Sequence, residues 1–265
     1  MEKSKITSFL KRLATTLVLV PIVVACVVFG YPTIYLLALL GAALLSWEWA
    51  NMIPSSRQLF YAITYLFVAA TVILIESLII DAFVIVTAFI IAFFKSKGEI
   101  YRKFLLLGIP YISIGIGAIT AIYSAYGVQI VLWFLFLVWG VDIGGYIFGC
   151  TIKGPKLAPK ISPNKTWAGL IGGMFLAMAI SYGVCWFFGA ASWEISRYYV
   201  AMAAILAVIA QIGDLIESYI KRRLGIKDSS NLIPGHGGIF DRIDGLIFAA
   251  PFAFVMLLSL VYIIR

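Results

Sequence analysis

The residues of this chain best suited to chemistry lie between Ser218 and Asp244, here called the signature segment. The segment begins with a basic block, made of Lys221, Arg222, Arg223 and Lys227. Clustered basic side chains are natural partners for phosphates. A glycine-rich turn follows, Pro234-Gly235-His236-Gly237-Gly238, with the only histidine of the chain. Because glycine has no side chain, backbone N–H groups in such a turn can approach an anion closely.

Two carboxylates, Asp241 and Asp244, follow the turn and open the next apolar run. On a helix, residues three apart lie on one face, so these carboxylates would be neighbours. Close carboxylates repel each other unless a cation or a proton lies between them. Mg²⁺ prefers oxygen ligands and often binds one or two carboxylates together with substrate phosphates. The spacing therefore indicates a site for a divalent cation and phosphates.

A further acid, Asp214, lies inside the apolar run that precedes the basic block. An acid at the bilayer centre costs roughly 2.5–3.5 kcal/mol, so such residues are functional candidates. On a helix Asp214, Glu217 and Ser218 share one face, and Glu217 can pair with Lys221. For Asp214 we favour metal ligation over neutralisation by a nearby base. For Glu217 a structural pair with Lys221 and a metal role are equally supported.

Asp142 lies in an earlier apolar run, and the loop after it carries Ser162, Lys165 and Thr166. The two hydroxyls can cap a helix or contact phosphate, and the lysine supplies a point charge. We favour phosphate binding over a loop whose lysines only set membrane orientation. Glu48, between two tryptophans, fits an interfacial anchor better than a catalytic role. His236 suits a loop-ordering hydrogen bond and a phosphate contact equally well.

Composition points to an integral membrane protein, because 63% of the residues are apolar and 12% are charged, whereas soluble domains carry about a quarter. The length fits one integral domain over residues 1–265, and the fold class expected is all-α. Nine apolar segments have the length of a membrane-spanning helix, roughly 17–25 residues. They are residues 13–30, 32–51, 58–76, 78–95, 103–123, 127–149, 166–190, 198–220 and 243–264.

Basic residues predict the orientation of these segments. With a cytoplasmic N-terminus, 18 of the 20 Lys and Arg fall on the cytoplasmic side. The same choice puts the signature segment and a polar cavity on that side, where nucleotides are. The net charge of +8 is therefore explained by topology rather than by nucleic-acid binding. Glycine pairs four residues apart, such as Gly140 and Gly144, favour close helix packing over a dimer seam.

The signature segment resembles that of the phosphatidate cytidylyltransferases, also called CDP-diacylglycerol synthases. The pattern is matched by Ser218, Ile220, Lys221, Arg222, Lys227, Asp228, Ser230, Ile233, Pro234 to Gly238 and Asp241 to Asp244. The stretch from Asp142 and the loop with Ser162, Lys165 and Thr166 are also similar to the family. Two departures are Gly145 in place of alanine and Asn164 in place of lysine, which puts a phosphate contact at position 164 in doubt.

The resemblance implies that CTP and phosphatidic acid give CDP-diacylglycerol and pyrophosphate, in a multi-pass protein of the cell inner membrane. The catalytic region would be residues 214–244. Metal binding falls to Asp214, Asp241 and Asp244, which would hold Mg²⁺ and in addition a second cation. Phosphate handling falls to Lys221, Arg222, Lys227 and Arg242. Substrate contacts fall to Asp142, Ser162, Lys165, Thr166, Ser218, Gly235, His236, Gly237 and Gly238.

Expected partners are CTP, phosphatidic acid and membrane lipids, no nucleic acid, and in addition a second copy of the chain. Two rival functions stay open. One is a transporter for a phosphorylated solute, which should show broken helices in paired halves; no such internal symmetry is visible. The other is a lipid or polyprenol kinase, against which the signature segment argues.

Overall fold

The computed structural model describes the backbone of residues 2–187, 193–233 and 237–264, and the side chains of residues 15–187, 195–233 and 237–260. Over these residues the chain forms nine helices and one two-stranded hairpin. They are α1 (Glu2–Phe29), α2 (Thr33–Met52), α3 (Gln58–Ile75), α4 (Leu78–Lys95), α5 (Arg102–Tyr126), α6 (Val128–Thr151), β1 (Lys156–Ala158), β2 (Ser162–Thr166), α7 (Trp167–Phe187), α8 (Trp193–Arg223) and α9 (Phe240–Ile264).

Eight of the helices in the described part are long and apolar enough to cross a membrane, and α1 adds a shorter apolar stretch, Thr15–Phe29. Each predicted span contains one helix, which confirms the all-α, multi-pass expectation. The clearest local difference is the loop 150–165, where β1 and β2 form an antiparallel hairpin. Short strands of mixed lysine and proline carry no alternating apolar pattern, so no periodicity predicts them.

The chain divides into two compact units, which are described separately. Unit 1 contains residues 1–121 and 223–243, and unit 2 contains residues 122–222 and 244–265. The division passes through α5, α8 and α9. The prediction of one integral domain over 1–265 stays a prediction.

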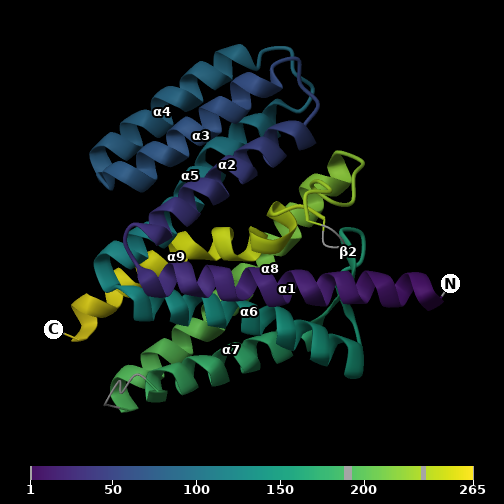
Figure 1. Cartoon of the computed structure of the whole chain (residues 1–265), viewed down its shortest axis with the longest axis vertical. Helices are drawn as coiled ribbons and strands as arrows, with labels where there is room; N and C mark the ends of the chain where they lie inside the picture. Colours follow the sequence, from purple (N-terminus) through teal and green to yellow (C-terminus); the bar gives the residue numbers. More distant parts are fainter. Residues whose placement is uncertain (1, 188–192, 234–236, 265) are drawn as a thin grey trace. The chain divides into compact units, whose positions relative to one another are not determined.

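In unit 1, helices α2, α3 and α4 run alongside one another (Figure 1). Large aromatic side chains are fully buried there and direct their polar atoms to the start of α5. The Trp49 indole N–H donates to the carbonyl of Phe104 at 3.0 Å, and the Tyr65 hydroxyl donates to that of Leu105 at 2.6 Å. These two buried polar atoms thereby have partners, as apolar surroundings require.

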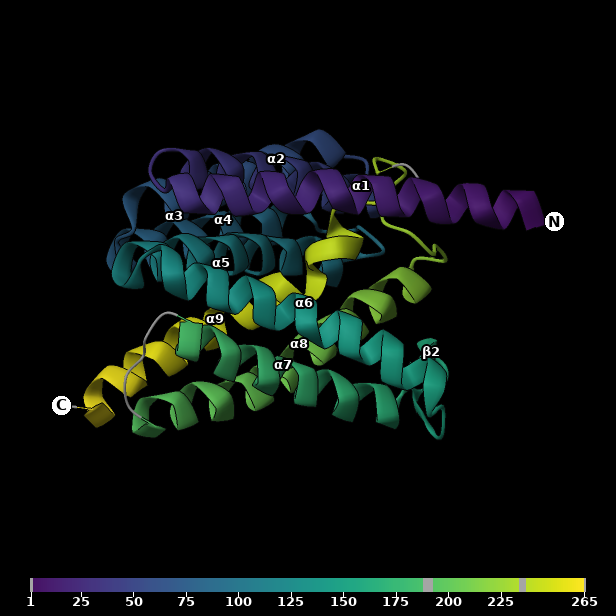
Figure 2. The ribbon, with the colours of Figure 1, turned by 60° about the horizontal axis from the view of Figure 1, so that its bottom comes forward.

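In unit 2, α6 and α7 pack along each other, and β2 lies at one end of this pair (Figure 2). Glycines make the close approach possible. A Cβ at Gly144 would lie 2.7 Å from the carbonyl oxygen of Gly172, and one at Gly173 would lie 2.7 Å from that of Val141. Since both obstacles are backbone atoms, a side chain would force the helices apart. The structure thus supports the packing interpretation of the glycine spacing.

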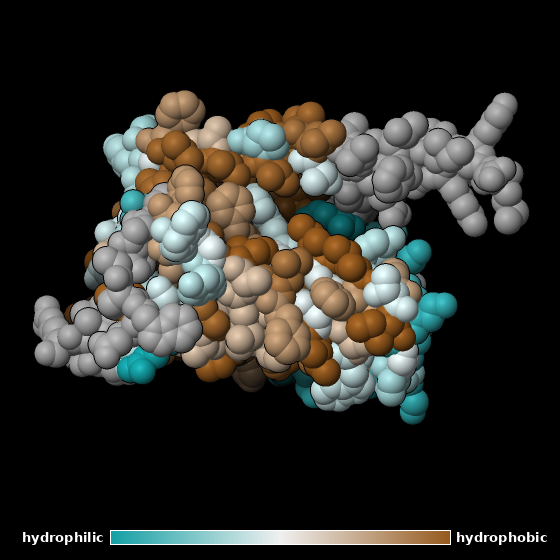
Figure 3. Space-filling model, turned by 90° about the horizontal axis from the view of Figure 1, so that it is seen from below, coloured by the Kyte–Doolittle hydropathy of each residue, from teal (hydrophilic) through white to brown (hydrophobic). Residues whose placement is uncertain are grey.

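Apolar side chains also cover outward faces of the helices. On α4, Leu78 and Ile79 are 84% and 83% exposed. Figure 3 shows hydrophobic side chains over much of the coloured face, with hydrophilic ones mostly towards its edges. Exposed apolar surface on this scale is expected where a protein meets lipid rather than water.

Candidate active site

Asp214 on α8 and Asp244 on α9 come together within unit 2. Their carboxyl groups lie close enough to interact electrostatically. Asp244 is buried, and Asp214 is partly exposed. The ammonium group of Lys165 forms an ion pair with Asp214, and the Gln211 amide donates to the same oxygen at 3.4 Å. Asp214 and Asp244 are therefore neighbours in the fold, and the ammonium group of Lys165 lies beside Asp214.

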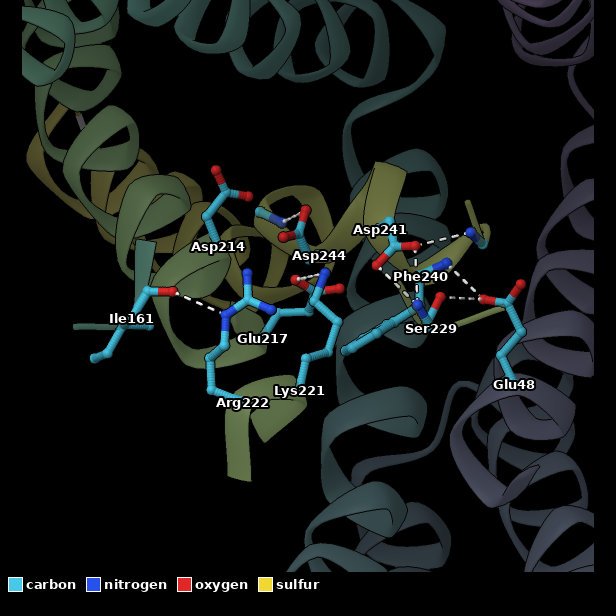
Figure 4. Close-up of polar contacts among 12 residues, drawn as sticks. Glu48, Ile161, Asp214, Glu217, Lys221, Arg222, Ser229, Phe240, Asp241 and Asp244 are labelled. Atoms are coloured by element: carbon cyan, nitrogen blue, oxygen red, sulfur yellow. Dashed lines mark hydrogen bonds and ion pairs between the residues drawn. The ribbon is translucent and has the colours of Figure 1, made fainter. Parts of the chain in front are cut away.

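Glu217 and Lys221 form a second ion pair one turn along α8, with 2.6 Å between Oε2 and Nζ. Both side chains are largely buried, at 3% and 10% exposure. The structure therefore confirms the structural pairing that was one of two interpretations of Glu217. Breaking a buried pair by removing one partner leaves an uncompensated charge. Lys221 is held in place by this pair (Figure 4).

The hairpin brings Lys165 to α8, because residues on both sides of it are fixed. The hydroxyl of Thr166 accepts the N–H of Gly169 at 3.0 Å, and so caps the start of α7. Arg222 at the end of α8 donates from Nε to the carbonyl of Ile161 at 3.4 Å. Of the two roles predicted for Thr166, the structure shows capping; phosphate contact stays a prediction.

The remaining predicted residues of unit 2 are spread along its helices. Ser162 is half-buried in β2, and Ser218 is half-buried on α8. Asp142 is exposed on α6. Their roles in substrate binding stay predictions.

In unit 1, the carboxylate of Asp241 binds both described parts of the signature loop, the name used here for residues 229–240. It accepts the N–H of Ser229 at 3.0 Å and that of Gly238 at 2.8 Å. The Ile233 N–H also donates to the carbonyl of Gly237 at 2.8 Å. Gly237 has φ of +87°, a left-handed backbone that favours glycine. The N–H of Gly238 donates to Asp241, and the substrate contacts expected at Gly237 and Gly238 stay predictions.

The other predicted residues of this region are placed as follows. Lys227 and Arg242 are exposed in unit 1. Pro234, Gly235 and His236 lie outside the described residues, so the expectations for Gly235 and His236 stay predictions.

A hollow of about 440 Å³ adjoins the signature loop in unit 1. The end of α2 contributes Asn51 and Met52 to its wall, and residues 226–231 contribute the rest. Lys227, Asp228 and two serines are among them, so most of the wall can donate or accept hydrogen bonds. The hollow is polar and borders the signature segment, and the cytoplasm-facing polar cavity stays a prediction.

Glu48 differs from its sequence-based interpretation as an interfacial anchor. It is fully buried rather than anchored at an interface, and it accepts four hydrogen bonds from the signature loop. The available signal was an acid inside an apolar run, which is costly without partners. Its partners lie more than 180 residues away in the chain, so no local pattern could name them.

The donor set for a divalent cation is oxygen-rich. Asp214 and Asp244 supply neighbouring carboxylates, and the Lys165 ammonium shows that a positive charge fits against the first of them. Among the described side chains, however, no three His, Cys, Asp or Glu residues converge closely enough to hold a metal. Two carboxylates completed by substrate phosphates suit Mg²⁺. The metal site stays a prediction, with Asp214 and Asp244 as the pair that fits it.

Comparison with known proteins agrees with this picture. The model of the family described as "Cytidylyltransferase family" matches residues 10–260. A phosphatidate cytidylyltransferase of Rickettsia conorii is 32% identical over 263 residues, covering 96% of this chain and 93% of the relative. One of Staphylococcus aureus is 34% identical over 191 residues, covering 71% of each chain.

A third relative, the phosphatidate cytidylyltransferase of Brucella suis, is 43% identical over 131 residues. That match covers 49% of this chain and 47% of the relative, so here the chain spans about half the length of its relative. The family model covers nearly the whole sequence, and on that ground the chain belongs to the cytidylyltransferase family.

Proposed function

We propose that the protein transfers CMP from CTP to phosphatidic acid, giving CDP-diacylglycerol and pyrophosphate. The observation that carries the proposal is the near full-length similarity to a protein named for this activity, together with an unbroken signature segment. The geometry of unit 2 agrees with it. Asp214, Asp244 and Lys221 lie on two helices long and apolar enough to cross a membrane, and the hairpin adds Lys165, which pairs with Asp214.

The reaction forms one bond and breaks one bond. An oxygen of the lipid phosphate attacks the α-phosphorus of CTP, and the bond from that phosphorus to the β-phosphate bridging oxygen breaks. The electron pair of the broken bond leaves with pyrophosphate. Because the lipid phosphate is already an anionic nucleophile, no strong general base is required. The main task of the protein is to bring two polyanions together and to stabilise the leaving group.

Basic side chains carry most of that task. Lys221 and Arg222 end α8, and we assign them, with Lys227 and Arg242 of the signature segment, to the phosphates. Lys165 pairs with Asp214, and we assign it a second role, in which it exchanges that partner for a substrate phosphate. Glu217 fixes Lys221 by their ion pair.

Asp214 and Asp244 would hold Mg²⁺, and the signature pattern adds Asp241 as a third expected ligand. When bound, the ion would offset the negative charge of carboxylates and phosphates and polarise the phosphoryl oxygens. Asp241 meanwhile orders the signature loop by accepting the backbone amides of Ser229 and Gly238. We also propose a second cation at this site.

The setting is the inner membrane, with the site and the N-terminus on the cytoplasmic side. The distribution of Lys and Arg supports this orientation. Membrane lipids, and in addition a second copy of the chain, are the proposed partners. Transport of a phosphorylated solute and a lipid kinase activity are the less favoured alternatives.

One assay tests the activity directly. Purified protein in mixed micelles receives CTP labelled on the α-phosphate, phosphatidic acid and Mg²⁺. The label should move into a lipid, with one pyrophosphate released for each lipid formed. ATP labelled on the γ-phosphate serves as the second arm. Label transfer from ATP with none from CTP would replace the proposal by a kinase, and no transfer in either arm would contradict it.

A further inference from the structure

The carboxylate of Glu48, on α2, is fully buried and receives four hydrogen bonds. Its Oε1 accepts from the Ser230 hydroxyl at 2.6 Å and from the Ile239 N–H at 2.9 Å. Its Oε2 accepts from the Ser229 hydroxyl at 3.2 Å and from the Phe240 N–H at 2.8 Å. Figure 4 shows Ser229 and Phe240 close to this carboxylate. The two oxygens each bind both ends of the signature loop.

The four hydrogen-bond donors determine which type of side chain fits at position 48. Two are backbone N–H groups, which can only donate, so the group facing them must accept on both of its oxygens. The same two N–H groups belong to the start of α9, where helix geometry leaves such donors without partners. The positive end of the helix dipole also favours a negative charge there. A carboxylate meets these demands better than any neutral side chain.

Further contacts join Glu48 to the rest of the loop. Asp241, just after the loop, accepts the backbone N–H groups of Ser229 and Gly238, while Glu48 accepts the Ser229 hydroxyl and the Phe240 N–H. Phe240 packs edge-on against Trp49, the neighbour of Glu48, with 5.1 Å between ring centroids. Two carboxylates therefore hold the described ends of the loop, Asp241 from α9 and Glu48 from α2.

We propose that Glu48 is a positioning residue of the transfer reaction. Its carboxylate fixes the two ends of the signature loop, and thereby the direction in which Lys227 and Arg242 meet the phosphates of CTP. This inference rests on the proposed function. It also implies that the start of α9 does not bind substrate phosphate directly, because Glu48 already occupies the N–H groups of Ile239 and Phe240.

The decisive variant is Glu48→Gln, which keeps the shape of the side chain. Whichever oxygen becomes an NH₂ group then faces a backbone N–H, of Ile239 or of Phe240, and a buried donor loses its partner. We expect kcat to fall about tenfold or more and the KM for CTP to rise at least about threefold. The KM for phosphatidic acid should stay unchanged. A smaller fraction of folded protein would lower kcat alone, so the rise of one KM identifies positioning.

Glu99→Gln is the matched control. The Glu99 carboxylate also accepts two serine hydroxyls and a backbone N–H, from Ser55 and Ser56, and none of these described partners belongs to the signature loop. Its kinetics should equal those of the unsubstituted protein. Hydrogen exchange of a peptide covering residues 229–240 gives a readout independent of activity. Exchange there should accelerate in Glu48→Gln and stay unchanged in Glu99→Gln.

Unchanged kinetics and exchange in Glu48→Gln would overturn the inference, as would a lower kcat with both KM values intact. If Glu48→Gln fails to insert into membranes, the double variant Ser229→Ala and Ser230→Ala decides. It removes the two hydroxyl donors and keeps the carboxylate, and the same selective rise of the KM for CTP is expected. Its absence there would count against positioning. An unsubstituted protein without activity would contradict the proposed function instead, and the exchange comparison would still decide whether Glu48 holds the loop.

Discussion

Replacing Asp214 by Asn tests whether this acid serves the reaction or only neutralises Lys165. The substitution keeps the size of the side chain and removes its charge. Two opposite charges about 4 Å apart attract by about 4 kcal/mol at an effective dielectric of about 20. The side chains of Lys165 and Asp214 are 22% and 23% exposed, so water screens part of this attraction. Loss of repulsion with Asp244 offsets more of it, and we expect a stability change of about 1 kcal/mol or less.

Catalysis should respond far more strongly. A charged group that acts on the phosphates in the transition state contributes about 3 kcal/mol, which is about a hundredfold in rate. We therefore expect Asp214→Asn to lose about a hundredfold or more in kcat while the melting temperature changes by only a few degrees. The assay is the formation of labelled CDP-diacylglycerol per folded protein, with melting measured on the same preparation.

A double variant separates the two explanations. If Asp214 acts in the reaction, Asp214→Asn combined with Lys165→Met should be at least as inactive as Asp214→Asn alone. If the pair is only structural, removing both charges should restore activity, because neither partner is left unpaired. Restored activity in the double variant would refute the reasoning. Glu76→Gln, which changes a carboxylate that accepts the Tyr35 hydroxyl, should leave the rate unchanged.

Three other predictions follow from the fold. Gly144→Ala should destabilise the protein by about 1–3 kcal/mol, because the new methyl group would lie 2.7 Å from the carbonyl oxygen of Gly172. Gly183→Ala is the control, since a Cβ there meets nothing within 4 Å, and the melting temperatures of the two variants should differ accordingly. Burial alone would raise the pKa of Glu99, but hydrogen bonds from Ser55 and Ser56 and the charge of Arg57 lower this pKa below its ordinary value of 4.5. The lowered pKa means that the carboxylate stabilises the fold above pH 4.5 and loses this effect as the pH falls through its folded-state pKa; the difference in melting temperature from Glu99→Gln should therefore be present at neutral pH and disappear in acid. Reporter fusions should place the N-terminus in the cytoplasm and the C-terminus outside; both ends on one side would contradict the charge-based orientation.

The positions of the helices could be read from the sequence because the cost of exposing a polar backbone to lipid leaves few alternatives. Apolar runs of membrane-spanning length therefore gave each helix of the described chain. The pairing of Glu217 with Lys221 could be read as well, since helix geometry alone brings residues four apart together. The glycine spacing indicated the close packing of α6 and α7 for the same local reason.

The sequence by itself determined the class of fold, the family and the set of charged residues from which a site is built. Only the tertiary structure decided which of those charges meet. Lys165 reaches Asp214, 49 residues away, through a hairpin that no periodicity announced. Glu48 receives donors 181 to 192 residues away, so an acid that resembled a surface anchor closes the signature loop. Such pairs form only when segments far apart in the sequence pack against each other. Because an unpaired buried charge is costly, the fold must bring each buried charge to a partner as its helices pack.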